Sequence, residues 1–148
     1  MKAVGHIKNL IEINNDRILG FRKALEDPNP INADLNIVFR EAIADSEHFA
    51  QELSQLAAQF GAEIDADDES VTGAFHRAWV DVKSLFGGKD RKSILEEAER
   101  GEDAIKASYE KALASGDLPG EVLNIVAQQA AQIKLSHDHI KALRDAAR

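Results

Sequence analysis

The chain contains no cysteine among its 148 residues. This absence excludes structural disulfides, thiolate metal sites and cysteine nucleophiles. The sequence also lacks a run of about 18 apolar residues, the length that a membrane-spanning helix requires, and its N-terminus lacks the apolar core of a signal peptide. We therefore expect a cytoplasmic protein without a membrane partner.

Basic residues are fewer than acidic ones, 18 against 26, and the formal net charge is −8. A negative chain repels nucleic-acid phosphates, so we expect no nucleic-acid partner. No strands are evident, no glycine-rich phosphate loop follows a strand, and no Ser-His-Asp grouping can be located. Nucleotide-dependent and acyl-transfer chemistry are therefore poorly supported.

Long segments carry apolar residues at alternating steps of three and four, the spacing of amphipathic helices. We predict one domain over residues 1–148. Its helices are expected at about 6–26, 33–60, 71–86, 91–114 and 119–146. Two prolines, Pro28 and Pro30, end the first helix because proline disfavours helix in the preceding residue and cannot donate a helical hydrogen bond.

The lengths of the connections predict the topology. Short turns at 27–32 and 115–118 imply two antiparallel hairpins, whereas residues 61–90 separate the second long helix from the third. A connection of that length can travel along the whole bundle and would make these two helices parallel. The expected fold is an all-α, ferritin-like four-helix bundle, with its hairpins joined by a long crossover that contains the short helix at 71–86.

One polar residue interrupts each long apolar stripe near its middle: Asn14, Ser46, Glu102 and Ser136. Counting from the turns places them at similar levels, so we predict a polar layer across the core. Bundle proteins build metal and cofactor sites in such layers. Because this layer supplies only one carboxylate, we interpret it as a device that fixes helix register, with a small-ligand or vestigial metal layer as the alternative.

The sequence resembles an uncharacterised bacterial family, a domain of unknown function in the ferritin-like superfamily. The similarity lies at 76–79, 87–90, 99–103 and 109–113, and further at 11–16, 137–138 and 142–145. Fold-level similarity implies a self-associating helical bundle in a structural, interaction or stress-associated role. The expected partner is therefore a second copy of the chain.

Di-iron proteins of this superfamily use a Glu on each of two helices and a Glu-x-x-His pair on each of the other two. Only Glu102 matches that pattern here, so we expect no cofactor and a non-enzymatic protein. The alternative is a degenerate iron or manganese oxidase or peroxidase after a rotation of helix register. Its candidate ligands are Glu102, Glu99, Asp45, His48 and His137.

The predicted short helix carries a distinctive group of residues: Phe75, His76, Arg77 and Trp79. They either cover one end or edge of the bundle or dock a protein partner, since Trp and Arg are common interface anchors. Partner docking through this helix is the remaining alternative function.

Overall fold

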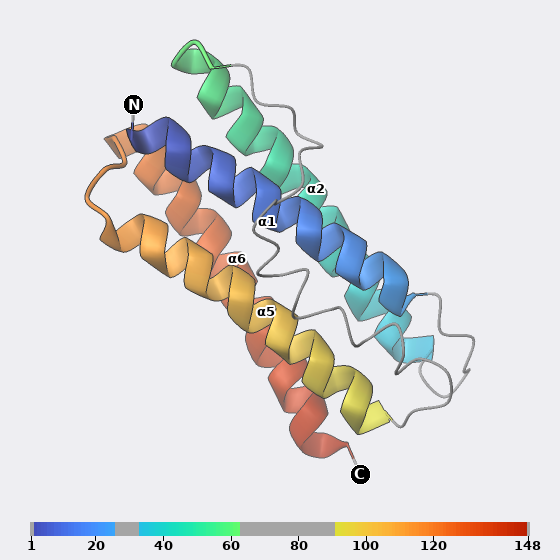
Figure 1. The fold of residues 1–148 in the computed structure, drawn as a ribbon. Coiled ribbons are helices and arrows are strands. Elements are labelled where there is room, and N and C mark those ends of the chain that lie inside the picture. The colour runs from blue at the N-terminus through green and yellow to red at the C-terminus, as the bar shows by residue number, and fades with distance from the viewer. Residues whose placement is uncertain (1, 26–32, 63–90, 148) are drawn as a thin grey trace.

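Four long helices make up most of the computed structural model, which describes residues 2–25, 33–62 and 91–147 (Figure 1). They are α1 (Lys2–Ala24), α2 (Ala33–Gln59), α5 (Arg91–Ala114) and α6 (Gly120–Ala146). No strand occurs in these ranges, and the predicted all-helical class is confirmed. The predicted helix at 71–86 lies outside the described residues.

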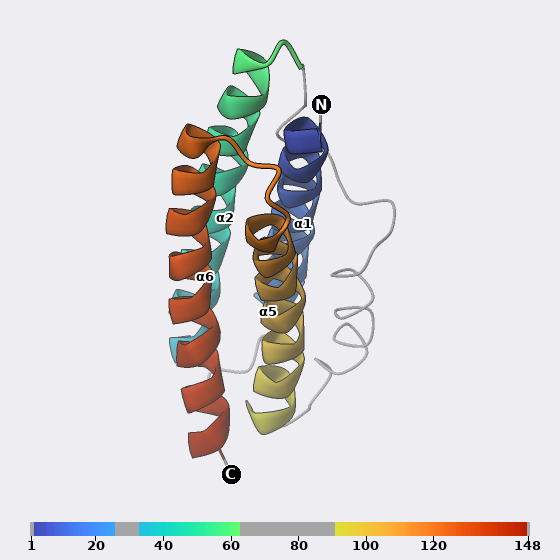
Figure 2. The ribbon, with the colours of Figure 1, turned by 90° about the vertical axis from the view of Figure 1, so that its left-hand side faces the viewer.

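The helices lie side by side, with α1 and α6 running in one direction and α2 and α5 in the other (Figures 1 and 2). An ion pair joins the starts of α2 and α5, where Arg91 donates from Nη1 and Nη2 to the two carboxylate oxygens of Asp34 at 2.7 Å each. At the opposite end, His6 near the start of α1 lies 3.0 Å from Asp117 in the turn between α5 and α6. The second and third long helices are therefore parallel.

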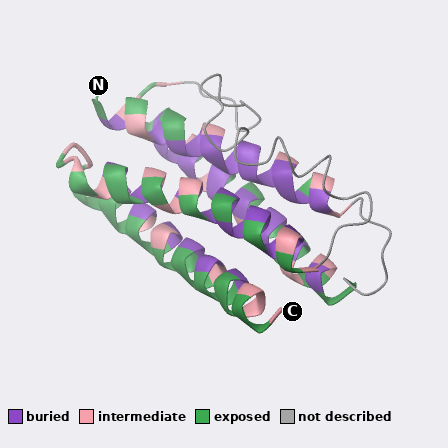
Figure 3. Cartoon of the chain, turned by 60° about the horizontal axis from the view of Figure 1, so that its bottom comes forward, coloured by how far each residue is buried: buried purple, intermediate pink, exposed green. Residues whose placement is uncertain are grey.

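The apolar stripes face the interior of the bundle (Figure 3). Packing is most extensive within the hairpins α1–α2 and α5–α6; α1 also packs on α5, and α2 touches α6 only sparsely. Burial of the stripes supplies the hydrophobic stabilisation, at roughly 25 cal/mol per Å² of apolar surface. The predicted stripe residues that become fully buried include Ile7, Ile11, Phe21, Leu35, Leu53, Leu95, Ile105, Val126 and Ile140.

Gly61 follows the C-terminal end of α2, close to the end predicted at residue 60. This glycine has a φ of 77°, a backbone conformation that residues other than glycine rarely adopt. The amide of Gly61 donates to the carbonyl of Ala58 at 3.0 Å, and the amide of Ala62 donates to that of Ala57 at 3.1 Å. These two bonds form a Schellman motif, which satisfies carbonyl groups at the helix end.

The start of α1 differs from the prediction, because the helix begins at Lys2 and not near His6. Gly5 lowers helix propensity there by about 1 kcal/mol relative to alanine. Burial of Ala3, which is 1% exposed, favours the additional turn. None of the helices in the described ranges combines the length and the apolar character needed to cross a bilayer.

Candidate functional site

A buried arginine lies at the centre of the polar layer. Arg17, on α1, and Glu102, on α5, are both 0% exposed. The guanidinium donates from Nε to Oε1 of Glu102 at 2.6 Å and from Nη2 to Oε2 at 2.8 Å. This bidentate, charge-assisted pair adds a cation to the predicted polar layer, in which Glu102 was the one charged residue.

The same guanidinium reaches the other helices of the bundle. Nη1 donates to Oγ of Ser46 at 3.0 Å and to the carbonyl of Ala42 at 3.3 Å, both on α2. Nη2 donates to Oγ of Ser136 on α6 at 3.0 Å. A guanidinium has five N–H donors, and these five bonds engage all of them. Arg17 is therefore a fully satisfied internal cation that contacts every described helix other than its own.

Asn14 extends the network along the core. Its Oδ1 accepts a hydrogen bond from Ser46 Oγ at 2.9 Å, and its Nδ2 donates to Leu10 O and to Tyr109 Oη, both at 2.8 Å. The structure thus places Asn14, Ser46, Glu102 and Ser136 in one connected network, whose hub, Arg17, the sequence reasoning missed.

Tyr109 carries the network toward the surface. Its hydroxyl donates to Oε1 of Gln129 at 2.6 Å, and Nε2 of Gln129 donates to Glu52 at 2.9 Å. Burial raises the pKa of the Tyr109 phenol, so the side chain remains a neutral donor over the ordinary pH range. The network therefore runs from the buried Glu102 to a partly exposed carboxylate on α2.

Two of the candidate metal ligands, Asp45 and His48, lie on α2. His48 is exposed and forms a long ion pair with Glu52, with Nε2 and Oε1 3.8 Å apart. Asp45 is half-buried and lines a groove of about 180 Å³ between α2 and α6, together with His139. Burial raises the pKa of the Asp45 carboxyl group.

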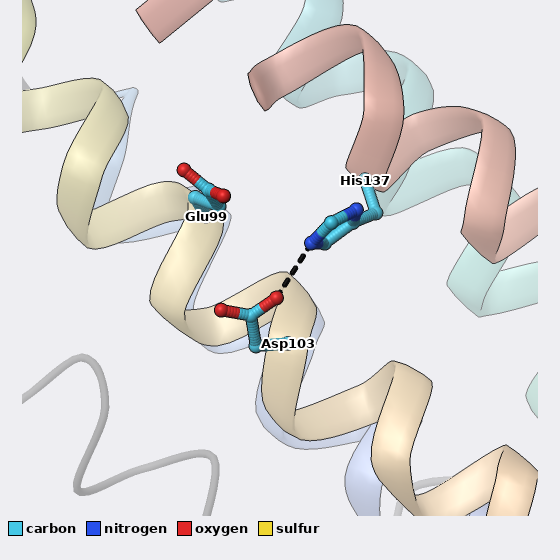
Figure 4. A group of neighbouring side chains, drawn as sticks. All are labelled: Glu99, Asp103 and His137. Atoms are coloured by element: carbon cyan, nitrogen blue, oxygen red, sulfur yellow. Dashed lines mark hydrogen bonds and ion pairs between the residues drawn. The ribbon is translucent and has the colours of Figure 1, made fainter.

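Two further candidates, Glu99 and His137, lie together with Asp103 at the interface of α5 and α6 (Figure 4). One potential ligand atom from each of the three lies within 4.8 Å of those from the other two. His137 is 7% exposed and Glu99 8%, whereas Asp103 is exposed. His137 Nε2 is 2.5 Å from Asp103 Oδ1. We call these three residues the α5–α6 cluster.

Charged neighbours surround the α5–α6 cluster. Arg144 forms an ion pair with Glu99 through Nη1. Asp138 Oδ1 lies 3.1 Å from His137 Nδ1, and Lys134 Nζ donates to Asp138 Oδ2 at 2.7 Å. These hydrogen bonds, from Lys134 first and then from His137, lower the pKa of the Asp138 carboxyl group to about 2.

Sequence reasoning missed Asp103, although a usable signal was present. Glu99 and Asp103 are four residues apart and therefore share one face of a helix. The group on the predicted short helix, Phe75, His76, Arg77 and Trp79, lies outside the described residues.

Over residues 2–25, 33–62 and 91–147 the chain is an all-helical fold of four packed helices with a charged core pair. The chain belongs to the family described as a domain of unknown function, DUF2383, whose model matches residues 2–115. The match covers α1, α2 and α5 and ends before α6, so the similarity noted at 137–145 lies beyond it. Comparisons with curated proteins and with solved structures gave no match.

Proposed function

We propose that this protein is a non-enzymatic, ferritin-like helical scaffold with a structural or interaction role, and that an internal arginine performs in its core the cross-linking that a metal centre performs in di-iron bundles. The observation that carries the proposal is the complete engagement of Arg17, whose five donors bond to groups on α2, α5 and α6.

The direction of the helices supports the ferritin-like part of the proposal. The Asp34–Arg91 ion pair joins the starts of α2 and α5, so these helices are parallel. Consecutive helices that run parallel, one from each hairpin, require a connection that spans the bundle, which is the arrangement with one long crossover.

The residues at the inward positions do not fit a di-iron centre. Such a centre needs four carboxylates and two imidazoles converging on one level. This level instead holds Asn14, Ser46, Ser136 and one carboxylate, Glu102, whose charge Arg17 neutralises. Both oxygens of Glu102 already accept short hydrogen bonds from the guanidinium, so a metal ion would have to displace a permanent cation.

The network gives the scaffold a defined register. Removing one partner from a buried ion pair leaves an uncompensated charge and destabilises a protein by about 3–5 kcal/mol. A slip of α5 by one turn would separate Arg17 from Glu102 and incur that penalty. A slip of α2 or α6 would remove the hydrogen bond to Ser46 or Ser136, at about 1–3 kcal/mol for a buried group left unpaired. These contacts favour the observed packing and support a structural role.

Iron(II) oxidation in air tests the proposal. The full chain and a His137→Ala variant, which lacks the imidazole of the α5–α6 cluster, are each mixed with iron(II), and oxidation and bound metal are measured. The proposal predicts that the His137→Ala variant oxidises iron(II) at the rate of buffer alone, whatever the wild type binds at the α5–α6 cluster. Two irons per chain with accelerated oxidation in the His137→Ala variant would overturn it, because that iron would have to occupy the core.

The proposal includes self-association, which the exposed aliphatic side chains on α2 and α6 support. Ile37 is 62% exposed and Leu135 is 66% exposed. Sedimentation of the full chain tests this part separately: a concentration-dependent oligomer that Ile37→Lys or Leu135→Lys shifts toward monomer is expected. A monomer at all concentrations would contradict it.

A further inference from the structure

We propose that Glu99, Asp103 and His137 bind one divalent transition-metal ion at the interface of α5 and α6. This site is separate from the Arg17 network and goes beyond the scaffold function. The ion would bind at the interface of two helices, whereas the core already contains the positive charge of Arg17.

The positions of the three side chains suit a single ion. Glu99 and Asp103 occupy consecutive turns of α5, and the imidazole of His137 reaches toward them from α6 (Figure 4). In a tetrahedral site with bonds of about 2.0–2.2 Å, ligand atoms lie about 3.4 Å apart. The three ligand atoms here lie within 4.8 Å of one another, with His137 Nε2 and Asp103 Oδ1 at 2.5 Å. Binding of one ion would require side-chain rotations that bring the three atoms to that separation.

Asp138 provides an independent indication of a metal ligand. Metal-binding histidines almost always donate from the second ring nitrogen to a carboxylate or a carbonyl, which fixes the orientation of the ring. Nδ1 of His137 lies 3.1 Å from Asp138 Oδ1, and Lys134 holds that carboxylate through its other oxygen at 2.7 Å. With Nδ1 donating to Asp138, Nε2 faces Asp103 Oδ1 at 2.5 Å, a contact that requires a proton between the two atoms. Metal binding would release that proton and turn Nε2 into a ligand.

The donor set indicates the class of metal. One imidazole with two carboxylates suits zinc, manganese, iron or cobalt, whereas calcium and magnesium prefer oxygen ligands alone. Two carboxylates also balance the charge of a divalent ion. Three protein ligands leave a fourth position for water or a small anion.

Arg144 competes with the metal ion for the carboxylate of Glu99. Its guanidinium forms an ion pair with Glu99, so binding requires Glu99 to exchange this partner for the ion. A positive charge beside the site also repels a cation. Removing that charge should therefore strengthen binding, a result that a merely structural role of the cluster does not predict.

Cobalt(II) and zinc(II) titrations of the full chain test the site. We expect saturable binding of one ion per chain, visible absorption bands of cobalt in a low-symmetry site, and displacement of cobalt by zinc. His137→Ala and Asp103→Asn should each weaken binding at least tenfold, and Arg144→Gln should tighten it severalfold. His139→Ala is the matched control, because His139 is exposed on the same helix, and it should leave the affinity unchanged.

Asp103 is exposed, so its variant keeps the test valid even if His137→Ala unfolds the chain. Equal affinity in the wild type and Asp103→Asn would overturn the site, as would binding without saturation. Binding that survives Asp103→Asn but is lost in Glu102→Gln would place the ion in the core, and would contradict the scaffold proposal as well.

Discussion

The Arg17 network and the α5–α6 cluster each pair a nitrogen-containing side chain with at least one carboxylate, but the balance of positive and negative charge differs between them. In the core, one arginine meets one glutamate, and every guanidinium donor has an acceptor. At the α5–α6 interface, three carboxylates (Glu99, Asp103 and Asp138) lie around or beside one histidine. Arg144 forms an ion pair with Glu99, and Lys134 forms one with Asp138.

This difference follows from burial. A charge in a dry interior is tolerated only when it is paired and hydrogen-bonded, so the core contains a permanent cation. At the α5–α6 interface Asp103 and Asp138 are exposed, so water and mobile cations screen part of the excess negative charge. The bundle thus carries a permanent cation, Arg17, in its core, and its proposed metal site lies at the α5–α6 interface.

The largest expected effect comes from removing the internal cation. Arg17→Met leaves Glu102 buried and unpaired, and we expect a loss of about 3–5 kcal/mol in the free energy of unfolding. Arg22→Met is the control, because Arg22 is exposed and pairs with the exposed Glu47 at 3.4 Å; we expect a change of about 1 kcal/mol or less there. Urea unfolding measures the free energy of unfolding of both variants. Equal losses would contradict the claim that the buried charge contributes more to stability than the surface charge.

An occupied α5–α6 cluster should stabilise the folded chain. At a zinc concentration about 100 times the dissociation constant, linkage predicts about 2.7 kcal/mol. Thermal unfolding with and without zinc measures this gain, and Asp103→Asn should lose it. A gain that persists in Asp103→Asn would show that the ion stabilises the chain at another place.

Removing the Tyr109 hydroxyl should interrupt the network at a neutral link. In Tyr109→Phe, Gln129 Oε1 loses its donor and Asn14 Nδ2 loses an acceptor. A buried polar group left without a partner costs about 1–3 kcal/mol. We expect a loss in that range, smaller than that of Arg17→Met, from denaturant unfolding. A loss as large as that of Arg17→Met would show that the network does not depend mainly on its charges.

The ion pair between Asp34 and Arg91 should give the smallest effect. Hydrogen bonding from Arg91 lowers the pKa of Asp34, so its contribution is present above the unfolded pKa of about 3.9 and is lost as the pH falls through the folded value. Asp34→Asn should be slightly less stable than the wild type at pH 7 and equal to it near pH 2. A stability difference between the wild type and Asp34→Asn that grows toward low pH would contradict a lowered pKa of Asp34.

Sequence periodicity predicted the described helices well, because burial of one stripe imposes the helical repeat on apolar residues such as Ile7, Ile11 and Phe21. It failed at Arg17, which lies three residues after Asn14 and four before Phe21 and therefore on the same inward face. Arginine is almost never fully buried without a partner, and the partner, Glu102, lies on another helix. A buried carboxylate could have prompted a search for an inward cation.

The α5–α6 cluster was only partly predictable for a related reason. The spacing of Glu99 and Asp103 is visible in the sequence, but their approach to His137 depends on the rotation of α6 against α5. Periodicity fixes which face of a helix is buried, and leaves open which polar residues at the edge of that face meet across the interface.

A double-mutant cycle on Arg17 and Glu102 tests the central claim most directly. The free energies of unfolding of the wild type, Arg17→Met, Glu102→Leu and the double variant are compared. We predict that each single variant loses about 3–5 kcal/mol and that the double variant loses no more than one of them, because it buries no unpaired charge. Losses that simply add would contradict the claim that the two side chains act as one buried pair.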